Sequence, residues 1–542
     1  MLRSKSLAAA VAACLLVSAA LPAHAASEQK TLEELRNTVI NLLQALVEQK
    51  VISPEQAAKL VQLAQEKAAK DASTADARDA GAVRVPYVPQ IVKDEIGRQV
   101  AEDLKPKVVE EVVAAAKTEG WGVPGALPDW LARVRATGDI RVRYQQDMFG
   151  TDNRPFTVPD FNSINAAGGI AKAGLNAFLD STEDRHRLRI RARLGLEAVL
   201  PNHFQAGIRL STGSALDPGS ESQTLGTGGA RYTVGVDQAY VRYENKDEDG
   251  LAPATVTAGR MPSPWFTPSE LVFARDLGFE GLAATLRTSF GKHGDAQASR
   301  GFLTLGAFPV QEVALNSKDS KWLVGAQLGT DLHLGYNDRL RVGAAFYDFI
   351  HLSGKLNPAG LSIYNYSAPP FIRYGNSYFD IQNSLDGSTN LFALAAKFQL
   401  ANLSIVYDHQ VGRYQFEVLA DAVRNVGYKA SDVLARSGIQ QATRNNGYVA
   451  EVSFGDNDAS SERGRWRIAG GYRYVQRDAV LDAWTDNDFH GGGTNARGYY
   501  LVGDLGLARG VSLRLRYLNA DVLDAPPPYA LDILQLDLNT RF

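Results

Sequence analysis

Arginines occupy every second position in one short stretch of the sequence. Arg187, Arg189, Arg191 and Arg193 alternate there with apolar residues. A guanidinium is permanently charged and offers five hydrogen-bond donors, so such a row either attracts anions or holds carboxylates. Other arginines follow the same alternation, namely Arg141, Arg143, Arg209, Arg242, Arg341, Arg467, Arg473, Arg514 and Arg516. Fewer acids, such as Asp139, Glu197 and Asp504, share their side. The sequence predicts a basic, water-facing wall whose arginines either select anions or only fix loops.

A second candidate site is the segment from Gly259 to Gly281. It leaves a strand through Gly-Arg-Met-Pro and is too apolar to be a free loop. It carries Arg260, Arg275, Asp276 and Glu280, as well as Glu270. Opposed acids and bases across a narrow passage would orient solute dipoles, so we expect a constriction here. The alternative is an outward loop that packs on a neighbouring subunit.

The sequence contains no recognisable catalytic constellation. The motifs HExxH, GxSxG and Walker A are absent, and the eight histidines are scattered. The single cysteine, Cys14, lies in the N-terminal apolar segment. We therefore expect no enzyme activity and no cofactor, although a Ser/His/acid cluster on neighbouring strands stays an alternative.

Three carboxylates at 482, 486 and 488 lie in a glycine-rich segment. Oxygen ligands at alternate positions can bind Ca²⁺, but the segment lacks the glutamate and the central glycine of a calcium-binding hand. We expect solvated loop carboxylates and no metal site.

Strands with a two-residue period predict the elements that position these arginines. From Arg187 to Leu200 one face is apolar and the other polar, which suits a wall between lipid and water. An arginine at mid-membrane on the lipid face would cost ~2–4 kcal/mol, so the arginines must face the lumen. Similar strands are expected at about 137–146, 203–212, 232–244, 253–260, 280–290, 300–308, 322–329, 340–346, 390–400, 402–411, 414–424, 446–455, 465–476, 497–507, 510–519 and 530–542.

Connections between these strands alternate in length. Short turns fall at 201–202, 336–338 and 509–510. Long polar loops are expected at 147–185, 213–231, 351–389, 425–446 and 477–496. This arrangement is typical of a mainly β, transmembrane, antiparallel up-and-down β-barrel. Seventeen strands is an odd number, so we expect about 18 with an added strand near 371–381, or about 16 if two strands between 390 and 424 merge.

The N-terminal part of the chain has different patterns. Arg3 and Lys5 precede an apolar stretch, and small residues up to Ala25 and Ala26 predict signal-peptide cleavage between these two alanines. We expect a signal peptide at 1–25, a helical hairpin or coiled-coil segment at 26–72, a linker and amphipathic helix at 73–135, and the barrel at 136–542. The leucine seam favours either a hairpin that packs on itself or self-association.

Composition excludes other classes. No stretch beyond the first 25 residues has the ~20 consecutive apolar residues of a transmembrane helix. The net charge of −3 gives no basic footprint for nucleic acid.

Several motifs resemble one family. Val85-Pro86-Tyr87-Val88-Pro89, the run from Gly120 to Trp130, Asp486-Asn487-Asp488-Phe489, and the closing Leu534-Gln535-Leu536-Asp537-Leu538 resemble the proteobacterial "putative porin" family. Thr31–Asn37 and Gly493-Thr494-Asn495 add to the likeness, which spans nearly the whole chain after the signal segment. The motifs mark architecture and not a substrate.

The patterns and the resemblance together imply a water-filled outer-membrane channel. We expect passive diffusion of small hydrophilic solutes, with a preference for anions, and a periplasmic N-terminal segment. Outer-membrane lipid, a homo-oligomer such as a trimer, and the barrel-insertion machinery, which reads the terminal Phe542, are the expected partners. The alternative is a structural or adhesion barrel tethered through its periplasmic helices.

Overall fold

The computed structural model describes Gln62 and residues 133–247, 250–291, 298–314, 316–524 and 528–542. The expected signal peptide, its cleavage between Ala25 and Ala26, and nearly all of the N-terminal helical segments lie outside these residues. None of the described helices is long and apolar enough to cross a membrane.

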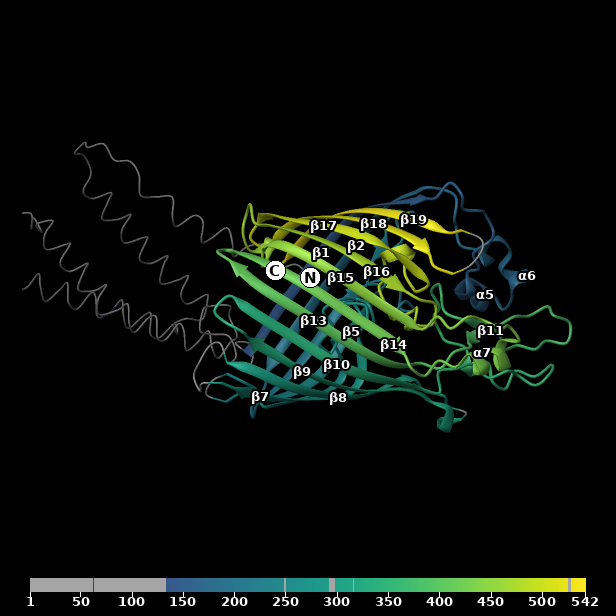
Figure 1. Ribbon diagram of the computed structural model, residues 1–542, viewed down its shortest axis with the longest axis horizontal. Helices are drawn as coiled ribbons and strands as arrows, with labels where there is room; N and C mark the ends of the chain where they lie inside the picture. The colour runs from purple at the N-terminus through teal and green to yellow at the C-terminus, as the bar shows by residue number, and fades with distance from the viewer. Residues whose placement is uncertain (1–61, 63–132, 248–249, 292–297, 315, 525–527) are drawn as a thin grey trace, which may run out of the picture. The chain divides into compact units, whose positions relative to one another are not determined.

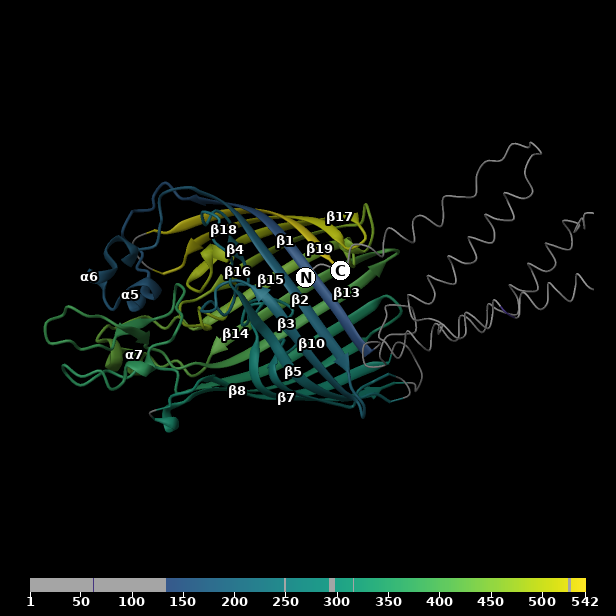
Figure 2. The ribbon, with the colours of Figure 1, turned by 180° about the vertical axis from the view of Figure 1, so that it is seen from behind.

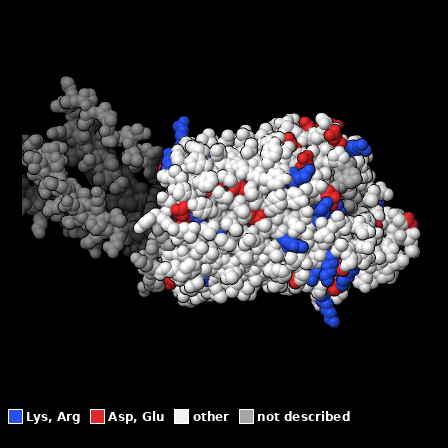
Figure 3. All heavy atoms as spheres, in the orientation of Figure 1, with Lys and Arg blue, Asp and Glu red and all other residues white. Residues whose placement is uncertain are grey.

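Alternation of side chains determines the strands. In β2 (Arg185–Val199), Leu188, Leu194 and Leu196 are exposed on the outer face, whereas Arg191 and Arg193 form ion pairs on the inner face. Successive side chains of a strand point to opposite faces, so this pattern puts the apolar row against lipid and the arginine row inside. The wall facing the viewer in Figure 3 is accordingly largely uncharged between its two ends.

Sixteen antiparallel strands close into a barrel (Figures 1 and 2). Each strand pairs with its neighbours around the sheet, and β1 (Val134–Phe149) pairs with β19 (Ala530–Arg541), with Tyr144 opposite Leu536. Closure leaves no free strand edge, as a membrane requires. The other barrel strands are β3 (Phe204–Thr212), β5 (Val234–Asn245), β6 (Ala254–Met261), β7 (Phe279–Phe290), β8 (Ser299–Gln311), β9 (Lys321–His333), β10 (Asp338–Ile350), β13 (Gln399–Val411), β14 (Tyr414–Asn425), β15 (Asn446–Asp456), β16 (Trp466–Val475), β17 (Ala496–Ala508) and β18 (Val511–Val522).

The two ends of the barrel differ. The turn end carries the short connections, including 200–203, 334–337, 412–413 and 509–510, together with Phe542. The loop end, at the right of Figure 1, carries the long ones at 150–184, 213–233, 262–278, 351–398, 426–445 and 476–495. The predicted division into turns and long loops is confirmed.

One predicted strand is wrong. Residues 390–400 do not cross the membrane: β12 (Phe392–Leu394) pairs only with β11 (Tyr378–Asp380) in a small separate sheet, and the barrel resumes at Gln399. The count is therefore 16, the smaller of the two expected values. The extra strand expected near 371–381 exists only as the three residues of β11.

Short helices and one further short strand lie in the loops at the loop end. They are α5 (Phe161–Ala167), α6 (Ile170–Ala173), η2 (Gly174–Ala177), β4 (Gln223–Thr224), η3 (Ser317–Asp319), η4 (Asn365–Ser367), α7 (Ala430–Ser437) and η6 (Phe489–Gly491), while η5 (Ala459–Ser461) lies between β15 and β16. Asn165 of α5 donates its Nδ2–H to the Phe392 carbonyl at 2.9 Å, so the loop 150–184 contacts the loop 351–398.

Candidate functional site

The first inner loop, residues 262–278, folds into the barrel. Trp265 packs edge-on against Phe308 of β8 and Tyr347 of β10. The Phe266 N–H donates to Gln327 Oε1 at 2.7 Å, and Gln327 Nε2–H donates back to the Phe266 carbonyl at 2.9 Å. Gln327, on the inner face of β9, is fully buried. The wall therefore holds this loop through a paired amide contact as well as through apolar packing.

Two glycines let the chain leave the wall. Gly259 and Gly281 lie opposite each other in β6 and β7, with φ of 113° and 141°. A Cβ on either would lie 2.3 Å from a neighbouring carbonyl oxygen, of Ala239 or Ala307. Only glycine fits both the positive φ and this close approach.

The second inner loop, residues 476–495, packs against the first. Trp484 contacts Phe273, Phe279 and Phe349 at ring-centroid distances of 5.5–6.3 Å. The Ala274 N–H donates to the Trp484 carbonyl at 2.7 Å. Thr485 Oγ1 donates to the backbone carbonyls of the first loop, and Arg473 of β16 donates to Thr485 at 2.7 Å. Two loops, rather than one, thus narrow the barrel.

The loop 351–398 contacts the second inner loop by donating hydrogen bonds to two buried carboxylates of that loop. Asp478 accepts from the N–H and the Oγ–H of Ser377 at 2.9 and 2.6 Å. Asp482 accepts from the Tyr378 hydroxyl at 2.8 Å. Burial raises the pKa of both Asp478 and Asp482 to about 6, because desolvation penalises the charged form more than the hydrogen bonds favour it.

Asp488 anchors the second inner loop to the wall. It lies 2.9 Å from Arg143 of β1 and 2.8 Å from Arg516 of β18. Arg143 also pairs with Asp537 of β19 at 2.6 Å. Burial opposes ionisation of Asp488, but Arg143 and Arg516 outweigh it and hold the pKa of this carboxyl well below its usual range.

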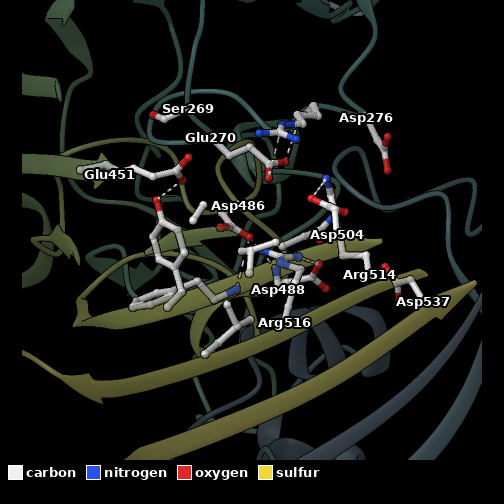
Figure 4. A pocket seen from close by; sticks show the side chains of 18 of the residues that line it. Ser269, Glu270, Asp276, Glu451, Asp486, Asp488, Asp504, Arg514, Arg516 and Asp537 are labelled. Carbon is white, nitrogen blue, oxygen red and sulfur yellow. Dashed lines mark hydrogen bonds and ion pairs between the residues drawn. The ribbon is translucent and has the colours of Figure 1, made fainter. Parts of the chain in front are cut away.

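A charged cavity of about 610 Å³ lies between the inner loops and the wall from β14 to β2. Figure 4 shows Glu270 and Asp276 of the first inner loop across the cavity from Asp488 and Arg516. Nine arginines line it, Arg141, Arg143, Arg191, Arg193, Arg275, Arg467, Arg473, Arg514 and Arg516. Eight carboxylates line it as well, Glu270, Asp276, Glu417, Glu451, Asp486, Asp488, Asp504 and Asp537.

Seven of the arginines that the sequence indicated lie along β1, β2 and β3. Arg141, Arg143, Arg191 and Arg193 line the charged cavity. Arg187, Arg189 and Arg209 follow the same strands beyond the cavity lining, where Arg187 pairs with Asp147 and Arg209 with Asp237. The structure brings the row together on one inner face.

The four residues expected at a constriction separate into two pairs. Arg275 and Asp276 line the charged cavity, and Asp276 pairs with Arg191 and Arg193 at 3.3 Å. Arg260 and Glu280 pair with each other and border a smaller pocket of about 180 Å³ near Trp484. The first inner loop therefore contributes only one of the pairs to the cavity.

The structure places more acids on the inner face than the three that the sequence indicated. Asp147, Asp237, Asp408, Glu417 and Asp537 are all on inner faces of strands and all pair with arginines. Asp147 was expected in a loop, and the other four acids lie on strands whose polar faces carry few arginines, so the arginine rows did not indicate them. The lining of the charged cavity is therefore nearly charge-balanced, with nine arginines and eight carboxylates.

The reading of the carboxylates at 482, 486 and 488 as solvated is also wrong. All three are less than 10% exposed. Within the described residues no group of three or more histidine, cysteine or acidic side chains could hold a metal ion. The glycine-rich composition concealed the second inner loop, although the apolar residues at 480, 481, 484 and 489 indicated burial.

A family model described as "Putative porin" matches residues 36–542. The chain belongs to this porin family. Membership and the closed barrel identify it as a porin-like outer-membrane β-barrel protein.

Several solved structures match this chain at low sequence identity. OprB of Pseudomonas putida is 12% identical, with a TM-score of 0.42, covering 78% of this chain and 97% of that chain. OmpT of Vibrio cholerae, solved in a trimer form, is 9% identical with a TM-score of 0.38, covering 76% and 99%. OmpF of Salmonella typhi, solved in complex with daunomycin, is 11% identical with a TM-score of 0.38, covering 76% and 97%. No curated protein matches the sequence.

Proposed function

We propose that the barrel is a channel for passive diffusion of small hydrophilic solutes across the outer membrane. The observation that supports this most is the charged cavity of about 610 Å³ inside a closed wall. A barrel of about 16 strands is too wide for wall side chains to fill, so its free space depends on loops. Here the two inner loops narrow it and leave a polar passage.

The composition of the lining favours polar solutes over apolar ones. Arg275 and Asp276 face the arginines of β1 and β2, while Glu417 and Glu451 lie on β14 and β15. Fixed positive and negative charges that lie close together across the passage orient the dipole of a passing solute. We further propose a weak anion preference, because nine arginines face eight carboxylates in the lining.

Conductance in a planar bilayer tests the channel. Folded protein should give stepwise currents in KCl, and a heat-denatured sample is the control. A zero-current potential in a KCl gradient then gives the selectivity, which should weaken as salt shortens the screening length from ~10 Å at 0.1 M to ~3 Å at 1 M. Liposome swelling with sugars, amino acids and organic acids identifies the solute class.

Folded protein without conductance would contradict the proposal and favour the tether or adhesin. The homotrimer stays a prediction. Chemical crosslinking in native membranes measures the oligomeric state.

A further inference from the structure

Carboxylates hold most arginines on the inner face of β1 and β2. Arg143 pairs with Asp488 and Asp537, Arg187 with Asp147, and Arg193 with Asp139, Glu221 and Asp276. Arg191 pairs with Asp139 at 2.9 Å and Asp276 at 3.3 Å. These arginines fix loops and order the wall.

Two arginines of the same row have no such partner. Within the part of the chain that the structure describes, Arg141 and Arg189 form no ion pair. Arg141 Nη2 donates to Ser222 Oγ, and Arg189 Nη1 donates to Gln145 Oε1 at 3.2 Å. Both side chains are partly buried, and the Arg189 Nε–H is buried without an acceptor. Two permanent cations are therefore held by neutral groups alone.

The two unpaired guanidiniums are neighbours. In the β1–β2 register Arg141 lies opposite Arg191, and Arg143 lies opposite Arg189. Arg141 and Arg189 are thus diagonal on one face, with Cα atoms roughly 7–8 Å apart, within the reach of long side chains. The loop 213–233 runs beside β2 here: Thr224 of β4 pairs with Arg189 in the sheet, and Ser222 contacts Arg141.

The nearest acids are already engaged. Asp488 is shared by Arg143 and Arg516, and Asp537 pairs with Arg143. Four arginines, at positions 141, 143, 189 and 516, therefore surround two carboxylates, and a positive excess remains beside Ser222. Because Arg141 also lines the charged cavity, a solute in the passage can reach this excess.

We propose that Arg141, Arg189 and Ser222 form a binding site for a small oxyanion, the carboxylate or phosphate group of a solute, at the edge of the charged cavity. A planar guanidinium matches two oxygens of such a group bidentately, and the serine hydroxyl adds a further donor. The site rests on the proposed channel and gives it a solute class. An anion that passes should pause there, so its effect on the current should saturate.

Calorimetric titration of the folded, detergent-solubilised protein tests the site without requiring conduction. The probes are inorganic phosphate and acetate, each at constant ionic strength set with NaCl, so that screening does not change during the titration. We expect saturable binding of at least one probe. The two probes separate a phosphate site from a carboxylate site.

Variants locate the site. Arg141→Gln and Arg189→Gln should each weaken binding roughly tenfold or more, as expected for the loss of a hydrogen bond to a charged group. Arg514→Gln is the matched control, because Arg514 lines the same cavity but is paired with Asp504 at 2.6 Å. It should change affinity less than about twofold, since its charge is already neutralised. Ser222→Ala, in the loop 213–233, tests the site if a strand variant fails to fold, and should weaken binding severalfold.

The absence of saturable binding by the wild-type protein would overturn the site, as would equal weakening by Arg514→Gln and Arg189→Gln. Binding without bilayer conductance would support the oxyanion site and contradict the proposed channel function. Conductance without binding would leave a channel whose arginines only order its wall.

Discussion

Asp488 is the residue at which the wall and the second inner loop meet. Its carboxylate is shared by Arg143 and Arg516, from strands on either side of β19. Removing one partner of a buried charge cluster leaves the remaining charges uncompensated, which costs about 3–5 kcal/mol.

We expect Asp488→Asn to destabilise the barrel by an amount near that range. The heat-induced shift of the folded band in detergent gels measures it, as a lower conversion temperature. Asp504→Asn is the control: its partner Arg514 is 38% exposed, so the loss should be under about 1 kcal/mol. Equal conversion temperatures for the two variants would show that Asp488 is no anchor.

The buried carboxyl of Asp482 predicts a pH dependence. Its pKa of about 6 exceeds the usual 3.8, so the folded form takes up a proton as the pH falls through 6, and the contact with Tyr378 gains stability towards pH 4. At pH 7.5 the charged form lowers stability by roughly 3 kcal/mol. His490 acts in the opposite direction, because burial lowers its pKa to about 4 and favours its neutral form.

Asp482→Asn mimics the protonated carboxyl and isolates this effect from His490. The variant should convert at a higher temperature than the wild type at pH 7.5, and at the same temperature at pH 4.5. A variant less stable at pH 7.5 would show that the charge itself stabilises the contact.

At the scale of elements, the two inner loops set the width of the passage. Trp484 of the second loop packs against Phe273 of the first loop and Phe279 of β7, so the two loops stabilise each other. Replacing residues 479–491 with a short glycine linker should raise the single-channel conductance, because the deleted segment lies in the lumen. Deleting 384–388 from the exposed tip of the loop 351–398 is the control and should leave conductance unchanged. Equal conductance of both variants and the wild type would mean that the second loop does not narrow the path.

Local patterning explains which elements the sequence predicts. Strand β2 is recognisable because lipid and water impose strict alternation on neighbouring side chains. The error at 390–400 has the same origin: Ala393, Ala395 and Phe398 are buried inside the protein, and protein burial produces the same apolar pattern as lipid. The two-residue period alone does not distinguish a strand that faces lipid from a segment buried inside the protein.

The site was predictable only in part. The arginine row follows from strand alternation, and Arg275 and Asp276 from an apolar segment that also carries charge. The partner of Arg143, by contrast, lies 345 positions away in a loop, and no local signal fixes a loop's path through the lumen. The sequence therefore shows the cations of the wall and some acids that pair with them, such as Asp139, but not the loop carboxylate that pairs with Arg143.

On the scale of the whole molecule, the short turns and the closing strand share one end of the barrel. In outer-membrane barrels short turns face the periplasm. We therefore expect residues 26–120 to be periplasmic, and protease added to intact cells should spare them. Permeabilised cells are the control, in which the same protease should cut between Lys50 and Lys93. Cleavage there in intact cells would reverse the topology.

The seam between β1 and β19 also dictates when the protein can be assembled. The two strands come from opposite ends of the barrel sequence, with Asp139 opposite Arg541. The barrel can therefore close only after its last strand has been synthesised. Until then the growing sheet has two open edges of unpaired amides and carbonyls, which lipid tails cannot satisfy. Insertion strand by strand into the bilayer is thus unfavourable. We therefore expect both open edges to be covered during assembly until β1 and β19 pair.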